Sequence, residues 1–455
     1  MVDLPDMLSR GERARLFPVL ADTSKEGRTL SIFLACLQNV NELGRGLLSG
    51  LGVRTGARSR IETFTEVVLR KSNGKDAFRP DGLIVVTNGS NRWTALVEAK
   101  VGASDLSTEQ VEAYLELAKL NGVDALITLS NQFAPLPSHH PVNVGAVARR
   151  RAALFHWSWM YVLTESTLLL SNEDVADRDQ RVILQEMTRF LLHPSAGVKG
   201  FDQMPAAWSD LVGHVQAGGA ISAGSSDAKE VVGAWHQEVS DLCLTLSRQL
   251  GTDVDIRIPR AHLADPSQRQ KADLAKLAGE ARLHATLIVP AAAAPIEVCA
   301  DLEKRSVTFS MWLRAPDDRK GTKARVTWLL RQIPAVDVDR IYVRMFWPGR
   351  TAYTQHSLKA LRENPDLAGA DRAGRAVLSF EVMLVKDLGA KFGQRKTFIG
   401  ELESAAPEFY EKVGENLKAW QARAPKLRDE KADPGDVGTE ALREEMEMEA
   451  LAREN

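Results

Sequence analysis

The sequence has few residues of the kinds that mark several common protein classes. Its 455 residues include only three cysteines, and their wide spacing excludes a disulfide framework and a cysteine zinc site. No unbroken apolar run approaches the ~18 residues that a membrane helix needs, and the N-terminus lacks the apolar core of a secretory signal. We therefore expect a cytoplasmic protein without membrane contact.

The sequence also has no large excess of charge of one sign and no common nucleotide-binding motif. The net charge of −2 gives no sequence-wide basic excess, so any contact with nucleic acid has to come from a local patch. The sequence has no glycine-rich phosphate loop of the Walker type and no internal repeat. What remains is an ordinary globular composition, in a chain long enough for two or three domains.

The most informative stretch runs over residues 79–131. Residues 83–87 and 93–100 are rich in β-branched and apolar side chains, which predicts two strands. Asn88-Gly89 lies between them and is a strong signal for a tight hairpin. The two strands should therefore lie side by side and antiparallel.

Three charged residues accompany this hairpin. Asp81 precedes the first strand, while Glu98 and Lys100 project to one face of the second, because side chains alternate along a strand. Two carboxylates from neighbouring strands make an oxygen-lined site of the kind that Mg²⁺ prefers. Lys100 is suited to orient or deprotonate a metal-bound water that attacks a phosphate. A turn at Asp81 and a solvated strand face at Glu98 and Lys100 are the plain structural alternatives.

At these residues the sequence resembles the PD-(D/E)XK nuclease superfamily, which includes restriction endonucleases and RecB-like nucleases. Pro80-Asp81 corresponds to the PD motif and Glu98-Ala99-Lys100 to the ExK motif. The resemblance implies an α-β-β-β-α-β core and matches Gln110 to the glutamine of RecB-like members. It makes Asp81, Glu98, Lys100 and Gln110 the expected catalytic residues, with Mg²⁺ or Mn²⁺ held by Asp81 and Glu98. For Gln110, a helix-capping box with Ser107 remains the alternative.

The resemblance also implies a further acidic group from the helix that precedes the sheet. Spaced apolar residues predict a helix over 29–49, and Glu42 is its acidic residue. We therefore expect Glu42 as a third metal ligand. Glu62 and Glu66, on a predicted strand over 61–69, are the alternatives, and simple solvent exposure would also explain Glu42.

The fold class that we expect is α/β. A restriction-endonuclease-like N-terminal domain, with a central mixed sheet flanked by helices, would be followed by a second α/β or α+β domain. A stretch rich in Gly, Ala and Ser sets the boundary, and an acidic, polar stretch sets the end. The expected parts are a nuclease-like domain with a helical extension (1–215), a linker (216–228), a C-terminal domain of unknown role (229–425) and an acidic mobile tail (426–455).

Within these parts the pattern predicts individual elements. The N-terminal ones are a polar, partly helical lead-in (4–27), a helix (107–121) and a buried strand (123–130). The C-terminal ones are strands (285–290, 295–302, 306–314, 340–346 and 379–386) and helices (231–250, 323–332 and 407–423).

Together these features predict a metal-dependent endo- or exonuclease that hydrolyses phosphodiester bonds, in DNA in preference to RNA. Analogy with the superfamily suggests restriction, repair or defence. The alternative is a nuclease-like module that binds nucleic acid or protein without cutting. The sequence does not distinguish between a homodimer and a chain that binds a partner protein. Basic residues over 304–325, with Trp312 and Trp328, are either a second nucleic-acid surface or a solvated face.

Overall fold

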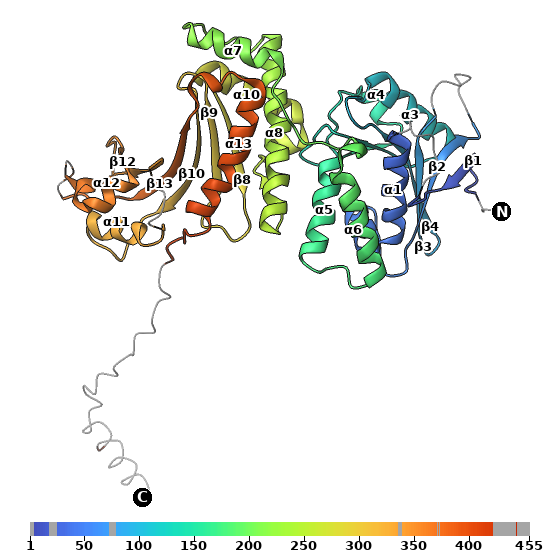
Figure 1. Ribbon diagram of the computed structural model, residues 1–455, viewed down its shortest axis with the longest axis horizontal. Helices are drawn as coiled ribbons and strands as arrows, with labels where there is room; N and C mark the ends of the chain where they lie inside the picture. Colours follow the sequence, from blue (N-terminus) through green and yellow to red (C-terminus); the bar gives the residue numbers. More distant parts are fainter. Residues whose placement is uncertain are drawn as a thin grey trace, which may run out of the picture. The chain divides into compact units, whose positions relative to one another are not determined.

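A computed structural model shows six strands of the first part of the chain joined in one mixed sheet, in sequence order (Figure 1). The strands are β1 (Leu8–Arg13), β2 (Arg60–Leu69), β3 (Gly82–Asn88), β4 (Asn91–Ala99), β5 (Ala125–Ser130) and β6 (Ala153–Ser158). β1 to β4 pair antiparallel, whereas β4, β5 and β6 pair parallel. Parallel neighbours need crossover connections, so helices must intervene between β4 and β6.

Helices cover both faces of this sheet. They are α1 (Lys25–Asn39), α2 (Asn41–Ser49), α3 (Thr108–Asn121), α4 (Ala146–Arg149), α5 (Trp159–Ser171) and α6 (Arg178–Leu192), followed by the short η1 (Pro194–Ala196). The next helix, α7 (Ala206–Gln216), packs in the core of the second region of the chain. Val97 and Ala99 of β4 pack in the core with α1, α2, α5 and α6, whereas Leu96 packs in the core with α3. Because side chains alternate, Glu98 projects to the α3 side.

The predicted hairpin is confirmed. Asn88 of β3 pairs with Asn91 of β4, so only Gly89 and Ser90 form the turn. Gly89 has φ +61°, a conformation that glycine adopts without the steric cost that other residues meet. The turn fixes the register that sets Gly82 opposite Val97, and so brings the start of β3 to the end of β4.

Two expectations for the first sixty residues were wrong. The lead-in contains the edge strand β1, whose pairing with β2 outweighs its polar, weakly patterned sequence. The helix expected over 29–49 is two helices, because Val40 between α1 and α2 is extended at φ −106° and ψ 103°. The break permits α2 to turn back, and Gly44 lies so close to the carbonyl of Leu37 that a Cβ there would clash.

A second, seven-stranded sheet is antiparallel throughout and follows the order β12-β11-β13-β10-β9-β8-β7. Its strands are β7 (Asp255–Ile256), β8 (Arg282–Ile288), β9 (Ile296–Asp301), β10 (Ser306–Arg314), β11 (Ile341–Phe346), β12 (Thr354–Ser357) and β13 (Ser379–Asp387). The five strands predicted for this region are among them. The protein is therefore an α/β protein with one mixed and one antiparallel sheet, both flanked by helices.

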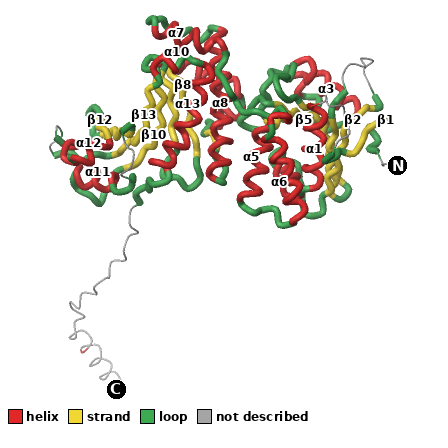
Figure 2. Tube along the Cα trace, in the orientation of Figure 1, coloured by secondary structure: helices red, strands yellow, loops and turns green. Residues whose placement is uncertain are grey.

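The helices of this second region are α8 (Ser226–Leu250), α9 (Arg260–Ala264), α10 (Pro266–Glu280), α11 (Thr322–Leu330), α12 (Leu358–Glu363) and α13 (Arg395–Phe409), with the short turns η2 (Pro365–Gly369), η3 (Gly389–Lys391) and η4 (Tyr410–Gly414) (Figure 2). The helix expected over 407–423 has the wrong bounds. Pro407 lies inside the last turn of α13, and the helical backbone ends with the π-helical η4 at Gly414. Residues 422 and 423 of the expected helix lie outside the described residues.

The structure describes residues 4–17, 25–71, 79–334, 339–370, 372, 374–421 and 443. Up to Trp420 they belong to one compact unit. Residues 217–225, which join α7 to α8, fall within the expected linker, and the expected tail (426–455) lies outside the described residues apart from Arg443. In the described part of the chain, no helix is long and apolar enough to cross a membrane.

Candidate functional site

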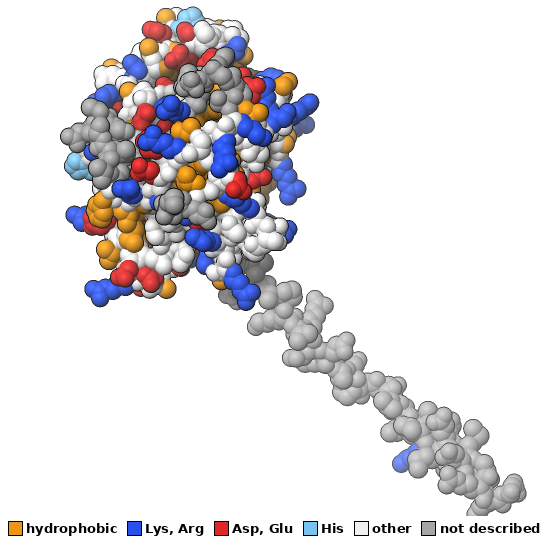
Figure 3. Space-filling view, turned by 90° about the vertical axis from the view of Figure 1, so that its right-hand side faces the viewer, with side chains coloured by type: hydrophobic (Ala, Val, Ile, Leu, Met, Phe, Trp, Pro, Cys, Tyr) orange, Lys and Arg blue, Asp and Glu red, His pale blue; other side chains and the backbone are white. Residues whose placement is uncertain are grey.

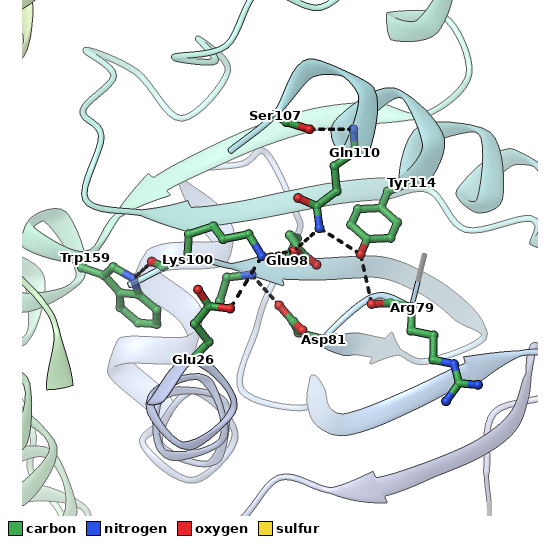
Figure 4. A network of polar contacts seen from close by, with 10 residues as sticks. Glu26, Arg79, Asp81, Glu98, Lys100, Ser107, Gln110, Tyr114 and Trp159 are labelled. Carbon is green, nitrogen blue, oxygen red and sulfur yellow. Dashed lines mark hydrogen bonds and ion pairs between the residues drawn. The ribbon is translucent and has the colours of Figure 1, made fainter. Parts of the chain in front are cut away.

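Asp81 lies immediately before the start of β3, where β3 lies beside the end of β4. Its Oδ2 accepts a hydrogen bond from the backbone N–H of Ala99 at 2.9 Å. This bond fixes the carboxylate against the end of β4, beside Glu98, as Figure 4 shows. The expected alternative, a free turn residue, therefore does not describe Asp81.

Glu98 is the most buried charged residue of the group, with 1% of its surface exposed. Its Oε1 accepts hydrogen bonds from Lys100 Nζ and from Gln110 Nε2, both at 2.7 Å. Its Oε2 is buried and has no hydrogen-bond partner among the described residues. A buried carboxylate oxygen without a partner is costly, so this atom has capacity for a further ligand.

The structure shows the helix cap at Gln110 and also brings its side chain to the cluster. Its backbone N–H donates to Ser107 Oγ at 3.1 Å, which caps the start of α3. Its side chain points the other way, to Glu98 and to the hydroxyl of Tyr114 at 3.3 Å. Tyr114 in turn donates to the carbonyl of Arg79 at 3.0 Å. The helix start and the sheet edge are therefore joined through one side chain.

Lys100 is anchored through its main chain. Its N–H donates to the carbonyl of Leu129 on β5, and its own carbonyl accepts from Trp159 Nε1, both at 2.8 Å. Its ammonium lies 2.7 Å from Glu98 and 3.6 Å from Glu26 (Figure 4). The side chain is thus held among acidic groups, and the expected solvated strand face does not apply to it.

Glu26 is a site residue that the sequence analysis missed. It lies in the first turn of α1, where an acidic residue is favoured by the helix dipole. We began the helix at Thr29, so Glu26 fell outside it. An earlier helix start, with an acidic residue in its first turn, was the available signal.

The structure does not bring Glu42 to this cluster. Glu42 begins α2, beyond the far end of α1. At 1.5 Å per residue the 15 residues of α1 span about 20 Å, and Glu26 and Glu42 lie at opposite ends of that span. The helix before the sheet does supply an acidic group, but from its opposite end.

Glu62 and Glu66, the two alternatives to Glu42, have different surroundings. Glu62 forms ion pairs with Arg13 and Arg60 on the same sheet. Glu66 has φ +52° at an irregularity in the pairing of β1 with β2, which is the geometry of a bulge. It lines a small cleft of about 110 Å³ together with Asp81. Glu66 is therefore the alternative that the fold places beside the cluster.

Clefts flank the cluster. Arg10 and Arg79 also line the small cleft beside Asp81. A larger cleft of about 670 Å³ is lined by Glu26, Lys25 and Lys199 and by residues 101–104. The acidic cluster thus has basic side chains in the clefts beside it, which is the arrangement that a polyanion needs.

Burial shifts the ionisation of all three charged residues. Burial raises the pKa of Asp81 well above its ordinary value, and the charge of Glu98 raises it further. Burial also raises the pKa of Glu98, against the lowering effect of its hydrogen bond to Lys100. For Lys100, burial lowers the pKa, but the hydrogen bond to Glu98 and the nearby acidic charges outweigh it and the pKa is raised. A further cation would therefore be favoured between the two carboxylates.

The residues present fit a hard divalent cation. Among the described residues, no group of three or more His, Cys, Asp or Glu side chains is arranged to hold a metal. The pair Asp81 and Glu98, with the unpartnered Oε2 of Glu98, offers oxygen ligands of the type that Mg²⁺ takes while it keeps several waters. The small cleft that Asp81 lines leaves room for water and phosphate oxygens beside that carboxylate.

Comparison with known proteins adds no relative. No protein-family model matches this chain, and a search of curated proteins finds no match for it. The site is therefore interpreted from its own residues. Asp81, Glu98, Lys100 and Gln110, which lie 29 positions apart or fewer in the sequence, converge in the structure, and Glu26 joins them.

Proposed function

We propose that this chain is a divalent-metal-dependent phosphodiesterase of the PD-(D/E)XK type, which hydrolyses DNA in preference to RNA. The observation that carries the proposal is the convergence of Asp81, Glu98 and Lys100 where the start of β3 meets the end of β4. One buried carboxylate oxygen of Glu98 has no hydrogen-bond partner among the described residues. The order α1, β2, β3, β4, α3, β5 supports the restriction-endonuclease-like fold that the sequence resemblance implies, once α2 is taken as an extension of the first helix.

The proposed roles follow from the contacts. Asp81 and Glu98 would hold Mg²⁺ or Mn²⁺, which when bound supplies Lewis-acid stabilisation of charge on the phosphate. Lys100 is positioned to hold the attacking water and to stabilise the negative charge that develops as the water oxygen bonds to phosphorus and the P–O bond breaks. Gln110 fixes the orientation of Glu98 through Oε1. Glu26 keeps Lys100 charged from the other side.

The surface supports a nucleic-acid substrate through local charge only. Figure 3 looks at the right-hand side of Figure 1 and shows lysine and arginine side chains spread over this face, with acidic side chains between them. Lys25 and Lys199 in the larger cleft, and Arg10 and Arg79 in the smaller one, are the basic residues nearest to the cluster. Contacts of this kind bind the phosphate backbone without reading sequence.

Cleavage assays test the proposal. Linear duplex, circular duplex and single-stranded DNA, and RNA, are incubated with Mg²⁺ or Mn²⁺ and with wild type, Asp81→Ala or Lys100→Ala. We expect wild type to cleave DNA and both variants to lose about a thousandfold in rate. Glu109→Ala changes an exposed neighbour on the same helix turn as Gln110 and should leave the rate within about twofold. Absence of cleavage by folded wild type, with nucleic-acid binding retained, would favour a binding module instead.

A further inference from the structure

In the described part of the chain, the second sheet has one face that packs in the core beneath helices and an opposite face, here called the uncovered face, on which some side chains are exposed. Figure 1 shows α8, α10 and α13 on the same side of this sheet. Val307, Phe309 and Met311 of β10 pack in the core on that side. The intervening residues, Thr308, Ser310 and Trp312, therefore project to the other face. On this face Trp312 is exposed, whereas Ser310 is buried.

Three aromatic side chains lie next to one another on the uncovered face. Trp312 and Phe346 stack at a centroid distance of 4.3 Å, and Phe346 lies 6.0 Å from Tyr353. Trp312 and Phe346 come from β10 and β11, which flank β13, where Trp312 is opposite Glu381 and Phe346 is opposite Ser379. Trp312 is 44% exposed and Tyr353 is 53% exposed. We call Trp312, Phe346 and Tyr353 the aromatic row.

The floor around the aromatic row is polar. Glu381 accepts from Ser310 Oγ at 2.9 Å and from Arg344 Nη1 at 2.8 Å. The Arg344 guanidinium also lies 4.5 Å from the ring centroid of Tyr353. The face around the row thus carries a paired arginine and a buried carboxylate in place of an apolar floor.

Further arginines lie at the end of the row. Tyr353 ends a loop over residues 347–353 that contains the exposed Arg350. Arg375 donates to Thr351 on this loop. Arg350 and Arg375 thus place positive charge at the Tyr353 end of the row, within reach of a bound strand's phosphates.

Only part of the basic set expected over 304–325 lies on this face. Trp312 and Arg314, two positions apart on β10, both project to it, and Arg314 pairs with Asp317. Arg325 is buried and donates to backbone carbonyls, and Trp328 is partly buried against the core. The other arginines beside Trp312 come from strands and loops that are distant in the sequence, so a linear charge pattern reveals only part of the surface.

We propose that the aromatic row binds single-stranded nucleic acid by stacking its unpaired bases on Trp312 and Tyr353. Exposed aromatic rings beside arginines are the feature by which sheet surfaces hold unpaired bases, whereas duplex bases are stacked on one another and cannot reach them. The inference rests on the proposed nuclease function for its meaning, because it names an unpaired strand as part of the substrate. The binding itself is measured without metal and so without cleavage.

Fluorescence anisotropy of the full chain in EDTA tests the proposal. The probes are labelled oligothymidylate and oligouridylate of about 16 nucleotides, the upper site size of single-strand binding modules, and a duplex of equal length. We expect the single strands to bind more tightly than the duplex, and Trp312→Ala or Tyr353→Ala to weaken single-strand binding about 5- to 100-fold. Trp312→Phe should retain affinity within about threefold but lose the quenching of tryptophan emission on binding.

Phe17→Ala is the matched control, because Phe17 is an aromatic residue that is 88% exposed on the first part of the chain. Its affinity should equal that of wild type. Single-strand affinity unchanged in both alanine variants, or absent from wild type, would overturn the proposal and leave a protein partner as the explanation of the row. Single-strand binding through the row by a chain that never cleaves would instead defeat the proposed nuclease function and leave this inference standing.

Discussion

Two pairs of buried acidic residues in this protein meet very different surroundings. Asp81 and Glu98 share their site with the ammonium of Lys100 and with clefts on the surface. Glu238 and Asp241, on α8, are also buried, and neither oxygen of Glu238 has a hydrogen-bond partner among the described residues. Burial raises the pKa of Glu238 well above its ordinary value, and the charge of Glu403 raises it further.

The difference shows that burial of acids does not by itself make a site. At the first pair, the charge of Lys100 works against burial and lowers the pKa of both carboxyl groups, and the small cleft gives access to Asp81. At the second pair, none of the clefts described above is lined by Glu238 or Asp241, and burial raises the pKa of Asp241 to about 6. Glu238 has no counter-charge of that kind among the described residues, and protonation is the outcome expected of an unpaired buried carboxyl group.

The same substitution at the two glutamates should have opposite functional results. Glu98→Gln keeps the shape of the side chain but removes its charge, so we expect the cleavage rate to fall about a thousandfold. Glu238→Gln should leave the rate within about twofold, because Glu238 lies in the second region and none of its interactions involves the cluster. Rates measured with saturating Mg²⁺ on the best DNA substrate check both. Equal losses in the two variants would mean that the comparison is wrong.

Divalent cations should stabilise the fold through the first pair. A cation present at about 100 times its dissociation constant adds about 2.7 kcal/mol to the free energy of unfolding. We expect Mn²⁺ to raise the thermal midpoint of wild type and of Glu238→Gln, and to leave Asp81→Asn unchanged. Differential scanning calorimetry in EDTA and in Mn²⁺ measures the shift. A shift of equal size in Asp81→Asn would place the cation elsewhere.

Stability should depend on pH through the second pair. The pKa of Glu238 is raised above its ordinary value of 4.5 in the folded state, so the folded chain keeps a proton that the unfolded chain releases above that pH. The contribution of this group therefore disfavours folding increasingly as the pH rises above about 4.5. Glu238→Gln should be more stable than wild type by about 1–3 kcal/mol near pH 8 and by much less near pH 5. Denaturant unfolding at both pH values measures it, and a pH-independent difference would contradict it.

The smallest expected effect separates Glu26 from Glu42. Glu26→Gln removes a charge 3.6 Å from Lys100, and we expect the cleavage rate to fall about tenfold. Glu42→Gln, on α2, should leave it unchanged. The two rates are compared under the conditions used for Glu98→Gln. A greater loss in Glu42→Gln than in Glu26→Gln would restore the assignment that the sequence alone favoured.

Much of the site follows from local sequence because its parts are local. Asn88-Gly89 sets the hairpin, and the hairpin register alone brings Asp81 to Ala99. Because side chains alternate along β4, Glu98 points toward α3, and Gln110 lies in the first turn of that helix. These relations need only strand geometry and a helix start, both of which are written in short stretches of residues.

The remaining features depend on tertiary packing. β1 is a polar strand that is held by its hydrogen bonds to β2, so its own sequence does not predict it. The extended Val40 ends α1 and removes Glu42 from the site, a change that an apolar stripe over 29–49 conceals. In the second region, the continuation of α13 through Pro407 defeats the rule that proline starts a helix. Glu26 reaches the cluster because it lies in the first turn of α1, whereas Glu42 lies beyond the last turn of that helix.

The anchoring of Lys100 has a consequence for how the chain is made. Its main chain is held by Leu129 and by Trp159, and the next turn is held where Gly102 donates to the carbonyl of Gly197. All of these partners are synthesised after Lys100. A nascent chain that has left the ribosome only as far as Lys100 carries every expected catalytic residue except Gln110, but none of the later partners that hold the lysine. Nascent or prematurely terminated chains would thus lack an assembled active site until about two hundred residues have emerged and folded.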